Sequence, residues 1–374
     1  MNTAPPTTDP MLWIPGPTKV RPEILSELTR PMIGHRSRAM VELIESLDPG
    51  LSLAFGLAPD SGSRVAVGTH SATAMMEGSL YGVGPRVLAI VNGAFSKRWA
   101  GIARTLGKDV TVLELPWGEA ADETSLTSAL GASEPFDAVT LVVNETSTGV
   151  WTPLAPIARA MATSPDTMLL CDVVSAIAGG PIDFDAHRID FALAGVNKAL
   201  ALPPGITVLA ASERYLAAAR ERERRTHYLD PVLLFDGHAA RKTPTTPNIG
   251  LFRALSRQLA DIAAGANLPA GSAPVSPEDG WAKRFETHAR MRERTLRWAA
   301  ERGLAPFPAP ALSSPTVSCL AADPQTIDDL LARWKAAGHE VGGGYGPLKG
   351  KTFRIGHMGD HTEAELDALF AALD

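Results

Sequence analysis

The chain has 374 residues, of which 45% are hydrophobic and 20% are charged, and its formal net charge is −6 at pH 7. Such a length suggests about two domains, and the composition is that of a folded globular protein, which excludes a disordered, collagen-like or disulfide-stapled chain. A mildly acidic chain also lacks the basic surface with which proteins bind nucleic acid or anionic membranes, so we expect neither partner.

Cysteine content and the N-terminal residues predict a cytoplasmic protein. Cys171 and Cys319 are the only cysteines, and both lie in apolar runs, which favours a reducing compartment. Residues 1–10 are polar and proline-rich and lack the basic and then apolar pattern of a signal peptide. No apolar stretch reaches the roughly 18 residues that are needed to span a bilayer.

Short β-rich runs recur along the first two thirds of the chain. They cover residues 64–68, 86–92, 109–115, 138–144, 167–172, 191–194 and 205–211. Most are continuous apolar runs, which is typical of strands that are buried on both faces. Helical patterns lie between many of them, as where Trp99, Ile102, Ala103 and Leu106 recur at helical spacing. The alternation predicts an α/β fold with a doubly wound, mostly parallel sheet.

The pattern changes after Pro247. Long helices are predicted over 249–266 and 281–303, followed by a strand (316–321), a helix (326–337), a strand (352–355) and a last helix (362–373). This order predicts a smaller C-terminal α+β domain. Because residues 267–277 are rich in Gly, Pro and Ser, we predict an N-terminal segment 1–20, a large domain 21–266 and a small domain 267–374.

Ligands of open α/β sheets bind at the carboxyl ends of the strands, so the residues that follow each strand are candidates. Residues 68–73 open a helix, and its first N–H groups favour either a phosphate or a simple capped turn. Asp172 ends an apolar strand and needs a partner, such as a protonated ring nitrogen or a backbone donor. Lys198 follows another apolar strand and is either a buried amine with a lowered pKa or a surface lysine.

Two further residues are candidates on the same grounds. Arg354 lies within an apolar strand and pairs either with a ligand carboxylate or with a structural Asp or Glu. Phe95 follows a strand and either stacks on a flat cofactor ring or packs in the core. A phosphate turn, a strand-end carboxylate and a strand-end lysine together meet the demands of pyridoxal phosphate, which is the cofactor that we predict.

The chain resembles the class V aminotransferases of the fold-type I pyridoxal-phosphate superfamily, especially the alanine–glyoxylate and serine–glyoxylate (serine–pyruvate) group. The resemblance covers nearly the whole chain. Its motifs, in order, are Ile14-Pro15-Gly16-Pro17-Thr18, Met32-Ile33-Gly34-His35-Arg36-Ser37, Asn144-Glu145-Thr146-Ser147-Thr148-Gly149, Asp172-Val173-Val174-Ser175, Asn197-Lys198-Ala199-Leu200, Pro203-Pro204-Gly205, Thr243-Pro244-Thr245-Thr246 and Phe353-Arg354-Ile355-Gly356-His357-Met358-Gly359.

This resemblance implies a role for each matching residue. Lys198 forms the Schiff base with the cofactor, Asp172 pairs with the pyridinium nitrogen, and Arg354 binds the substrate carboxylate. The other implied cofactor contacts are Ser71, Ala72, Thr73 and Asn197 at the phosphate, Phe95 on the ring face, Thr146 at the ring hydroxyl, and Thr243 and Thr246 from the neighbouring subunit of a homodimer. Gly16, His35 and Arg36 are implied on the substrate side, and no metal is implied.

The implied activity is transfer of an amino group from alanine or serine to glyoxylate or pyruvate by a ping-pong mechanism. A second possibility is a phosphoserine aminotransferase, because residues 34–37 also resemble the His-Arg pair with which those enzymes hold a substrate phosphate. A third is a lyase of the same fold, such as a cysteine desulfurase. Against the lyase, Asn197 stands where a histidine would be expected, and Cys319 lies in a predicted strand.

Two candidate functions outside this group of enzymes have less support from the sequence. A catalytically inactive homologue is disfavoured because Lys198, Asp172 and Arg354 are all present. A nicotinamide dehydrogenase is disfavoured because residues 82–84 precede a strand, whereas the dinucleotide fingerprint requires a following helix. The glycine-rich residues 342–346 are predicted to form a turn or a flexible substrate loop.

Overall fold

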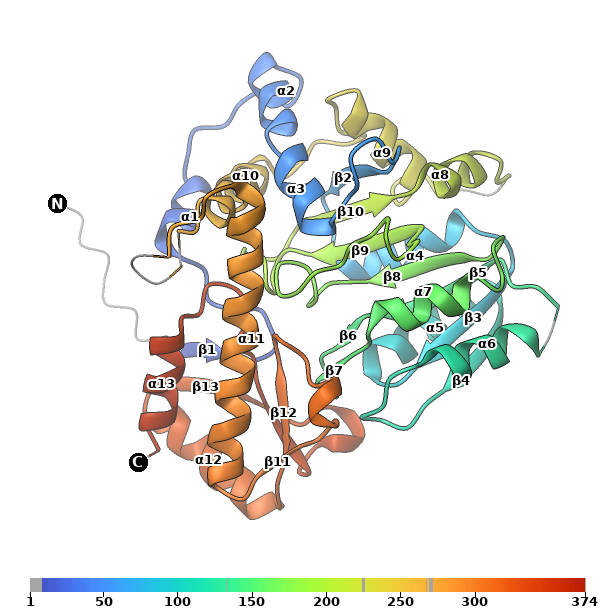
Figure 1. Cartoon of the computed structure of the whole chain (residues 1–374). Coiled ribbons are helices and arrows are strands. Elements are labelled where there is room, and N and C mark those ends of the chain that lie inside the picture. The colour runs from blue at the N-terminus through green and yellow to red at the C-terminus, as the bar shows by residue number, and fades with distance from the viewer. Residues whose placement is uncertain (1–8, 133, 224–225, 267, 269–271, 374) are drawn as a thin grey trace.

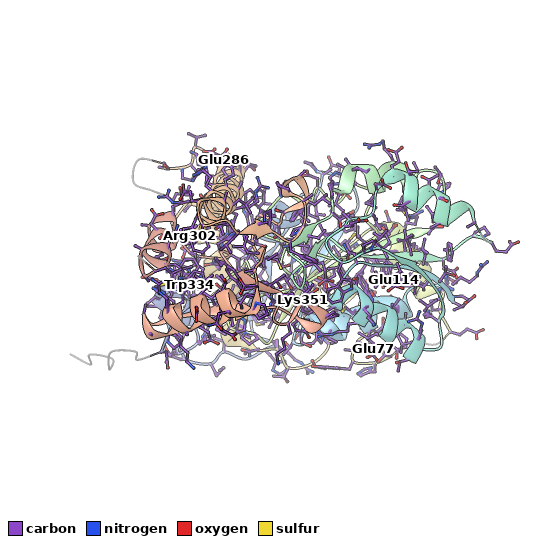
Figure 2. The ribbon with its side chains drawn as sticks, turned by 90° about the horizontal axis from the view of Figure 1, so that it is seen from below. Glu77, Glu114, Glu286, Arg302, Trp334 and Lys351 are labelled. Carbon is purple, nitrogen blue, oxygen red and sulfur yellow. The ribbon has the colours of Figure 1, made fainter. Side chains whose placement is uncertain are left out.

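The chain folds into two lobes, each built on its own sheet (Figure 1). The structure is a computed structural model, and it describes residues 9–132, 134–223, 226–266, 268 and 272–373. Seen from below, the lobes lie side by side (Figure 2). Glu77 and Glu114 mark the larger lobe, Trp334 marks the C-terminal lobe, and Lys351 lies near the junction. None of the helices in the described part of the chain is both long and apolar enough to cross a bilayer.

The larger lobe contains a seven-stranded sheet with the order β2-β10-β9-β8-β5-β3-β4. Its strands are β2 (Arg64–Gly68), β3 (Arg86–Val91), β4 (Asp109–Glu114), β5 (Ala138–Val142), β8 (Met168–Asp172), β9 (Phe191–Gly195) and β10 (Thr207–Ala211). Five of them, β9, β8, β5, β3 and β4, are parallel to one another. Val142, Asp172 and Leu193 lie in register across β5, β8 and β9, so the carboxyl ends of these strands meet at one edge of the sheet.

Both faces of this sheet are buried, because successive side chains of a strand point to opposite faces. Leu169 and Cys171 of β8 pack on one face, while Leu170 packs on the other. One face is covered by α2 (Arg38–Glu45), α3 (Asp48–Phe55), α6 (Glu123–Gly131), α7 (Leu154–Met161) and α10 (Ile249–Ala263). The other is covered by α4 (Ala72–Tyr81), α5 (Ala94–Thr105), α8 (Glu213–Arg220) and α9 (Pro231–Ala239). The short α1 (Pro22–Glu27) packs against α10.

The C-terminal lobe contains a five-stranded sheet with the order β1-β13-β14-β12-β11. Its strands are β1 (Met11–Trp13), β11 (Ala305–Pro306), β12 (Ser318–Ala321), β13 (His339–Gly343) and β14 (Thr352–Ile355), and its helices are α11 (Pro277–Glu301), α12 (Pro324–Ala336) and α13 (Glu363–Ala371). Trp13, Trp298, Trp334 and Phe353 form much of its core. A short hairpin, β6 (Asn144–Glu145) with β7 (Val150–Trp151), lies in the chain after β5.

A buried ionic cluster joins the N-terminal part of the chain to the C-terminal lobe. Asp360, whose side chain is fully buried, accepts hydrogen bonds from Arg21 at 2.7 Å and from Arg284 of α11 at 3.0 Å. Arg21 also contacts Asp261 of α10 at 2.8 Å. Breaking a buried pair of this kind strongly destabilises a protein, so the cluster fixes the arrangement of the elements that flank the site.

The predicted mostly parallel α/β sheet and the smaller C-terminal sheet are confirmed. Three features differ from the sequence-based expectation. The strand β10 is antiparallel to both of its neighbours. The N-terminal strand β1 pairs with β13 of the C-terminal sheet, which no local pattern indicated. Gly342 and Gly343, predicted in a turn, form the end of β13. The predicted boundary at residue 267 and residues 1–8 of the predicted N-terminal segment lie outside the described residues, and the division into domains stays a prediction.

Candidate active site

The strand ends of the large sheet and the first turns of α4 and α5 enclose a cavity of about 200 Å³. Val142 ends β5, Asp172 ends β8, and Lys198 follows β9. The residues that line the cavity are Ser71, Ala72, Thr73, Met76, Phe95, Arg98, Val142, Asn144, Thr146, Asp172, Val174, Ser175, Asn197 and Lys198. The fold therefore brings together eight of the predicted cofactor residues.

The helix α4 begins at this cavity and lacks a side-chain cap. Ser71 occupies the N-cap position in an extended conformation, but its hydroxyl accepts no hydrogen bond from the first turn. Within the described residues, no backbone hydrogen bond engages the N–H groups of Ala72 and Thr73. Free N–H groups at the positive end of a helix attract an anion, so this end of the cavity is suited to a phosphate.

Lys198 is largely enclosed by the N-terminal segment. Its Nζ donates to the carbonyl oxygen of Pro15. Gly16 has a φ of +94°, which favours glycine, and a Cβ there would lie 2.3 Å from Lys198 Cδ and displace the lysine side chain. Burial, together with the charge of Arg354, lowers the pKa of Lys198 to about 8, although Asp172 opposes this shift. A large share of the amine is therefore neutral at mildly alkaline pH, which is the form that attacks a carbonyl.

Asp172 is 4% exposed, and its Oδ1 accepts a hydrogen bond from the N–H of Val174 at 2.8 Å. Burial raises the pKa of this carboxyl to about 7; the Val174 N–H opposes the shift, and so do the charges of Lys198 and Arg98. A cation placed beside the carboxylate would hold it in the ionised form. The site thus pairs a lysine with a lowered pKa and a carboxyl group with a raised pKa, a combination that is typical of active sites.

Phe95 lies in the first turn of α5 and is held there by the fully buried Glu145. The Oε2 atom of Glu145 accepts hydrogen bonds from the N–H groups of Phe95 and Ser96, both at 3.0 Å, and Oε1 accepts from the Ser147 hydroxyl at 2.6 Å. A Cβ on Gly93 would lie 2.3 Å from Glu145 Cγ, so this position also requires glycine. The carboxylate caps the helix and fixes the Phe95 ring on the cavity wall.

Sequence reasoning gave no role to six residues of the cavity wall, and two of these, Arg98 and Asn144, carry polar groups of interest. Arg98 lies one helical turn after Phe95, and its Cζ is 4.8 Å from the Phe95 ring centroid. This spacing of three residues on a helix is the signal that could have found it. Asn144 donates from Nδ2 to Ser175 O at 2.9 Å and to Thr316 Oγ1 at 2.8 Å. Its buried Oδ1 has no partner among the described residues and remains available to a ligand donor.

Arg354 reaches the site from β14 of the C-terminal lobe. Its Nε donates to Gly343 O at 2.9 Å, and its Nη1 donates to Thr146 O at 3.2 Å. Arg354 is not among the residues that line the cavity, but Thr146 is, so the guanidinium lies at the edge of the cavity and bridges the two lobes. The two backbone carbonyls fix the guanidinium plane, and neither is a charged partner. A carboxylate ligand is the partner that a fixed, partly buried guanidinium favours.

The remaining predicted residues lie apart from this cavity in the single chain. His35 and Arg36 precede α2, and they are not among the cavity-lining residues. Thr246 is exposed, whereas Thr243 has a buried Oγ1 with no partner among the described residues. The implied roles of these four residues stay predictions.

These groups fit pyridoxal phosphate. The cavity offers a lysine amine, a buried carboxylate that forms no ion pair within the described part of the chain, an uncapped helix end for a phosphate, and an aromatic wall. The unpaired Asn144 Oδ1 adds an acceptor for a ligand hydroxyl.

The chain is similar in sequence and in structure to known aminotransferases. The family model described as aminotransferase class V matches residues 66–262. The serine–glyoxylate aminotransferase of Methylorubrum extorquens is 30% identical, over 95% of this chain and 88% of the relative. The L-aspartate–glyoxylate aminotransferase of Paracoccus denitrificans is 28% identical, over 96% and 88%. The crystal structure of an alanine–glyoxylate aminotransferase from Nostoc sp. has a TM-score of 0.85 at 26% identity, over 100% of this chain and 97% of that one.

The family model covers more than half of the chain, and the relatives align along nearly all of it. Both the predicted fold type and the predicted family are therefore confirmed. The protein belongs to the class V aminotransferases, and it is a pyridoxal-phosphate-dependent transaminase with the fold-type I architecture.

Proposed function

We propose that this protein transfers the amino group of a small L-amino acid, alanine or serine, to glyoxylate or pyruvate. The observation that carries the proposal is the position of the Arg354 guanidinium, fixed by Gly343 and Thr146 at the edge of the cavity that holds Lys198 and Asp172. An amino acid whose carboxylate binds Arg354 presents its Cα toward Lys198. The names of the relatives reported above all include glyoxylate as the acceptor, but they differ in the amino donor. They therefore support glyoxylate as the acceptor more strongly than they support any one donor.

The roles of the side chains follow from their positions. Arg354 binds and orients the substrate carboxylate, which places the reacting Cα instead of leaving it free to rotate. Neutral Lys198 Nζ acts first as a general base, which accepts the proton from Cα of the substrate. It then acts as a general acid, which donates the proton to the carbon atom on the other side of the transferred nitrogen. Asp172 holds a proton on the cofactor ring nitrogen. Pyridoxal phosphate supplies, when bound, an aldehyde that condenses with amines and a ring that accepts electrons.

The cofactor contacts belong to the same proposal. Ser71, Ala72, Thr73 and Asn197 hold the phosphate at the first turn of α4, Phe95 packs on the ring, and Thr146 contacts the ring hydroxyl. Gly16 leaves the space that Lys198 requires. The protein acts as a homodimer in which Thr243 and Thr246 reach the neighbouring cavity. The exposure of Thr246 and the unpaired Thr243 hydroxyl support that placement. Both cysteines are free and buried, which supports a cytoplasmic location.

A half-reaction titration tests the donor. The purified protein is loaded with pyridoxal phosphate, and the visible absorption band of the bound cofactor is followed while L-alanine, L-serine, L-aspartate or L-phosphoserine is added separately. We expect alanine or serine to bleach the band and glyoxylate to restore it. Bleaching by aspartate alone would contradict a small neutral donor.

The same titration decides the phosphoserine alternative. Bleaching by phosphoserine alone would overturn the proposed donor and assign the substrate phosphate to Arg36. The matched variant is Arg36→Ala, which would then lose the response to phosphoserine. If alanine is the donor, this variant keeps the response to alanine.

The pH dependence of cofactor uptake follows from Lys198. The pKa of Lys198 is about 8 and not 10.5, so its amine loses a proton at a pH about 2.5 units lower than in an ordinary lysine, and the neutral amine is the form that attacks the cofactor aldehyde. We expect the rate of uptake by the apoprotein to rise between pH 6 and 9 with a midpoint near 8. Since the charge of Arg354 lowers this pKa, Arg354→Gln should move the midpoint upward. Stopped-flow absorbance measures the rate of cofactor uptake in both proteins. A midpoint near 10 in the unmodified protein would contradict the lowered pKa of Lys198.

A further inference from the structure

Tyr345 is a partly exposed aromatic residue next to the site, and the functions assigned so far do not use it. It follows β13 and is 38% exposed, which makes it one of the few exposed large hydrophobic residues in the described part of the chain. Its ring centroid lies 6.0 Å from that of Phe95, with an angle of 27° between the ring planes. Arg354 Cζ also lies near this ring, 5.6 Å from the Tyr345 ring centroid.

These contacts form a continuous row of side chains across the junction of the lobes. Arg98 lies over Phe95, Phe95 stacks with Tyr345, and Tyr345 contacts Arg354. Arg98 and Phe95 belong to α5 of the larger lobe, whereas Tyr345 and Arg354 belong to the C-terminal lobe. Lys351, which follows the same loop, lies near the junction in Figure 2. Tyr345 does not itself line the cavity, but its ring lies next to both Phe95 of the cavity wall and the Arg354 guanidinium.

The loop that carries Tyr345 is folded tightly on itself. Leu348 N donates to Tyr345 O at 3.1 Å, and Lys351 N donates to Leu348 O at 3.0 Å. A Cβ on Gly344 would lie 2.0 Å from Leu348 O, so the loop can turn here only with glycine. Leu348 is buried beneath the turn. The backbone that carries Tyr345 is therefore held by β13 before it and by the turn after it.

We propose that Tyr345 determines the size of the amino-acid side chain that the site accepts. The inference rests on the proposed function, because it requires the substrate carboxylate to bind Arg354. A carboxylate on that guanidinium places the side chain of the amino acid next to the Tyr345 ring. A side chain of one or two heavy atoms fits beside the ring, whereas a longer branched one needs the volume that the ring occupies. Pocket shape of this kind discriminates by about 10- to 200-fold for each change of size.

Kinetics with two donors tests the inference. The ratio of kcat/KM for L-leucine to that for L-alanine is measured in the holoenzyme and in Tyr345→Ala, Tyr345→Phe and Lys349→Ala. We expect Tyr345→Ala to raise the ratio at least 10-fold, because the volume of the ring is freed. Tyr345→Phe keeps the ring and should change the ratio less than about 2-fold. Lys349→Ala is the matched control on the same loop, because its exposed side chain has no polar partner among the described residues.

A binding measurement separates this inference from the proposed function. Acetate and 4-methylpentanoate carry no amino group and cannot react, so calorimetry on the holoenzyme reports carboxylate binding alone. Tyr345→Ala should strengthen binding of 4-methylpentanoate relative to acetate at least 10-fold, and Arg354→Ala should weaken binding of both. If Tyr345→Ala leaves the affinity for 4-methylpentanoate relative to acetate unchanged while Arg354→Ala abolishes binding, the role of Tyr345 is overturned and the proposed function stands. Unchanged acetate binding in Arg354→Ala would overturn the carboxylate site and, with it, the proposed function.

Discussion

Lys198→Ala should abolish covalent attachment of the cofactor and lower the transamination rate at least about 1,000-fold. One substitution removes both the amine that binds the cofactor aldehyde and the group that moves the Cα proton, and general acid–base catalysis alone contributes about 100- to 10,000-fold. Attachment is measured by mass spectrometry after borohydride reduction, which adds the mass of the cofactor to the intact protein. The rate is measured in single turnovers with L-alanine.

Two controls separate loss of chemistry from loss of structure. Lys97→Ala changes an exposed lysine on the helix that carries Phe95, and we expect it to keep both attachment and rate. Added methylamine should restore part of the rate of Lys198→Ala, because a small amine can carry the proton in a cavity that has lost the lysine side chain. A Lys198→Ala protein that still turned over at the original rate would show that another group accepts the Cα proton.

The part of the site that lies at the strand ends could be predicted from the sequence. Asp172 and Lys198 each follow an apolar run, and parallel strands place their carboxyl ends at one edge of the sheet. The register across β5, β8 and β9 brings these residues to the same cavity. Local patterns were sufficient here because the direction of each strand fixes where its last residue lies.

The parts of the site that depend on distant contacts could not be predicted in this way. Arg98 has the sequence context of a solvated helix residue, and only its spacing from Phe95 indicates the shared face. Tyr345 was predicted in a turn, and nothing in residues 342–346 shows that this turn lies against Phe95, some 250 residues earlier in the chain (345 − 95 = 250). Glu145 was part of a recognised motif, but its role as the cap of α5 required the structure.

The pairing of β1 with β13 illustrates the same limit in the fold. Met11–Trp13 is only three residues long, and β13 ends in two glycines, so neither has a strong strand pattern. The pair forms because Trp13 is fully buried in the core of the C-terminal lobe. The same segment then delivers Pro15 and Gly16 to Lys198. Lys198 therefore contacts a segment whose position no local pattern reveals.

Asp172→Asn should lower the transamination rate about 100- to 1,000-fold while it stabilises the apoprotein at alkaline pH. The amide keeps the shape of the side chain and its bond from Val174 N–H, but it cannot hold a cationic ring nitrogen. Removing one partner of a buried charge pair costs about 3–5 kcal/mol, which is at least 100-fold in rate. Single-turnover absorbance with L-alanine measures the decrease.

The effect on stability has the opposite sign because burial raises the pKa of Asp172 from 3.8 to about 7 in the folded apoprotein. Well below pH 3.8 the carboxyl is neutral in both the folded and the unfolded state. As the pH rises to 7, the unfolded chain ionises first, and the folded state loses up to about 4 kcal/mol of stability. Asparagine carries no charge, so apo Asp172→Asn should melt at a higher temperature than the unmodified apoprotein at pH 8, and the difference should shrink at pH 5. Asp328→Asn, on the exposed side of α12, should show no such difference. A lower melting temperature for Asp172→Asn at pH 8 would mean that the buried carboxylate already has a compensating partner in the apoprotein.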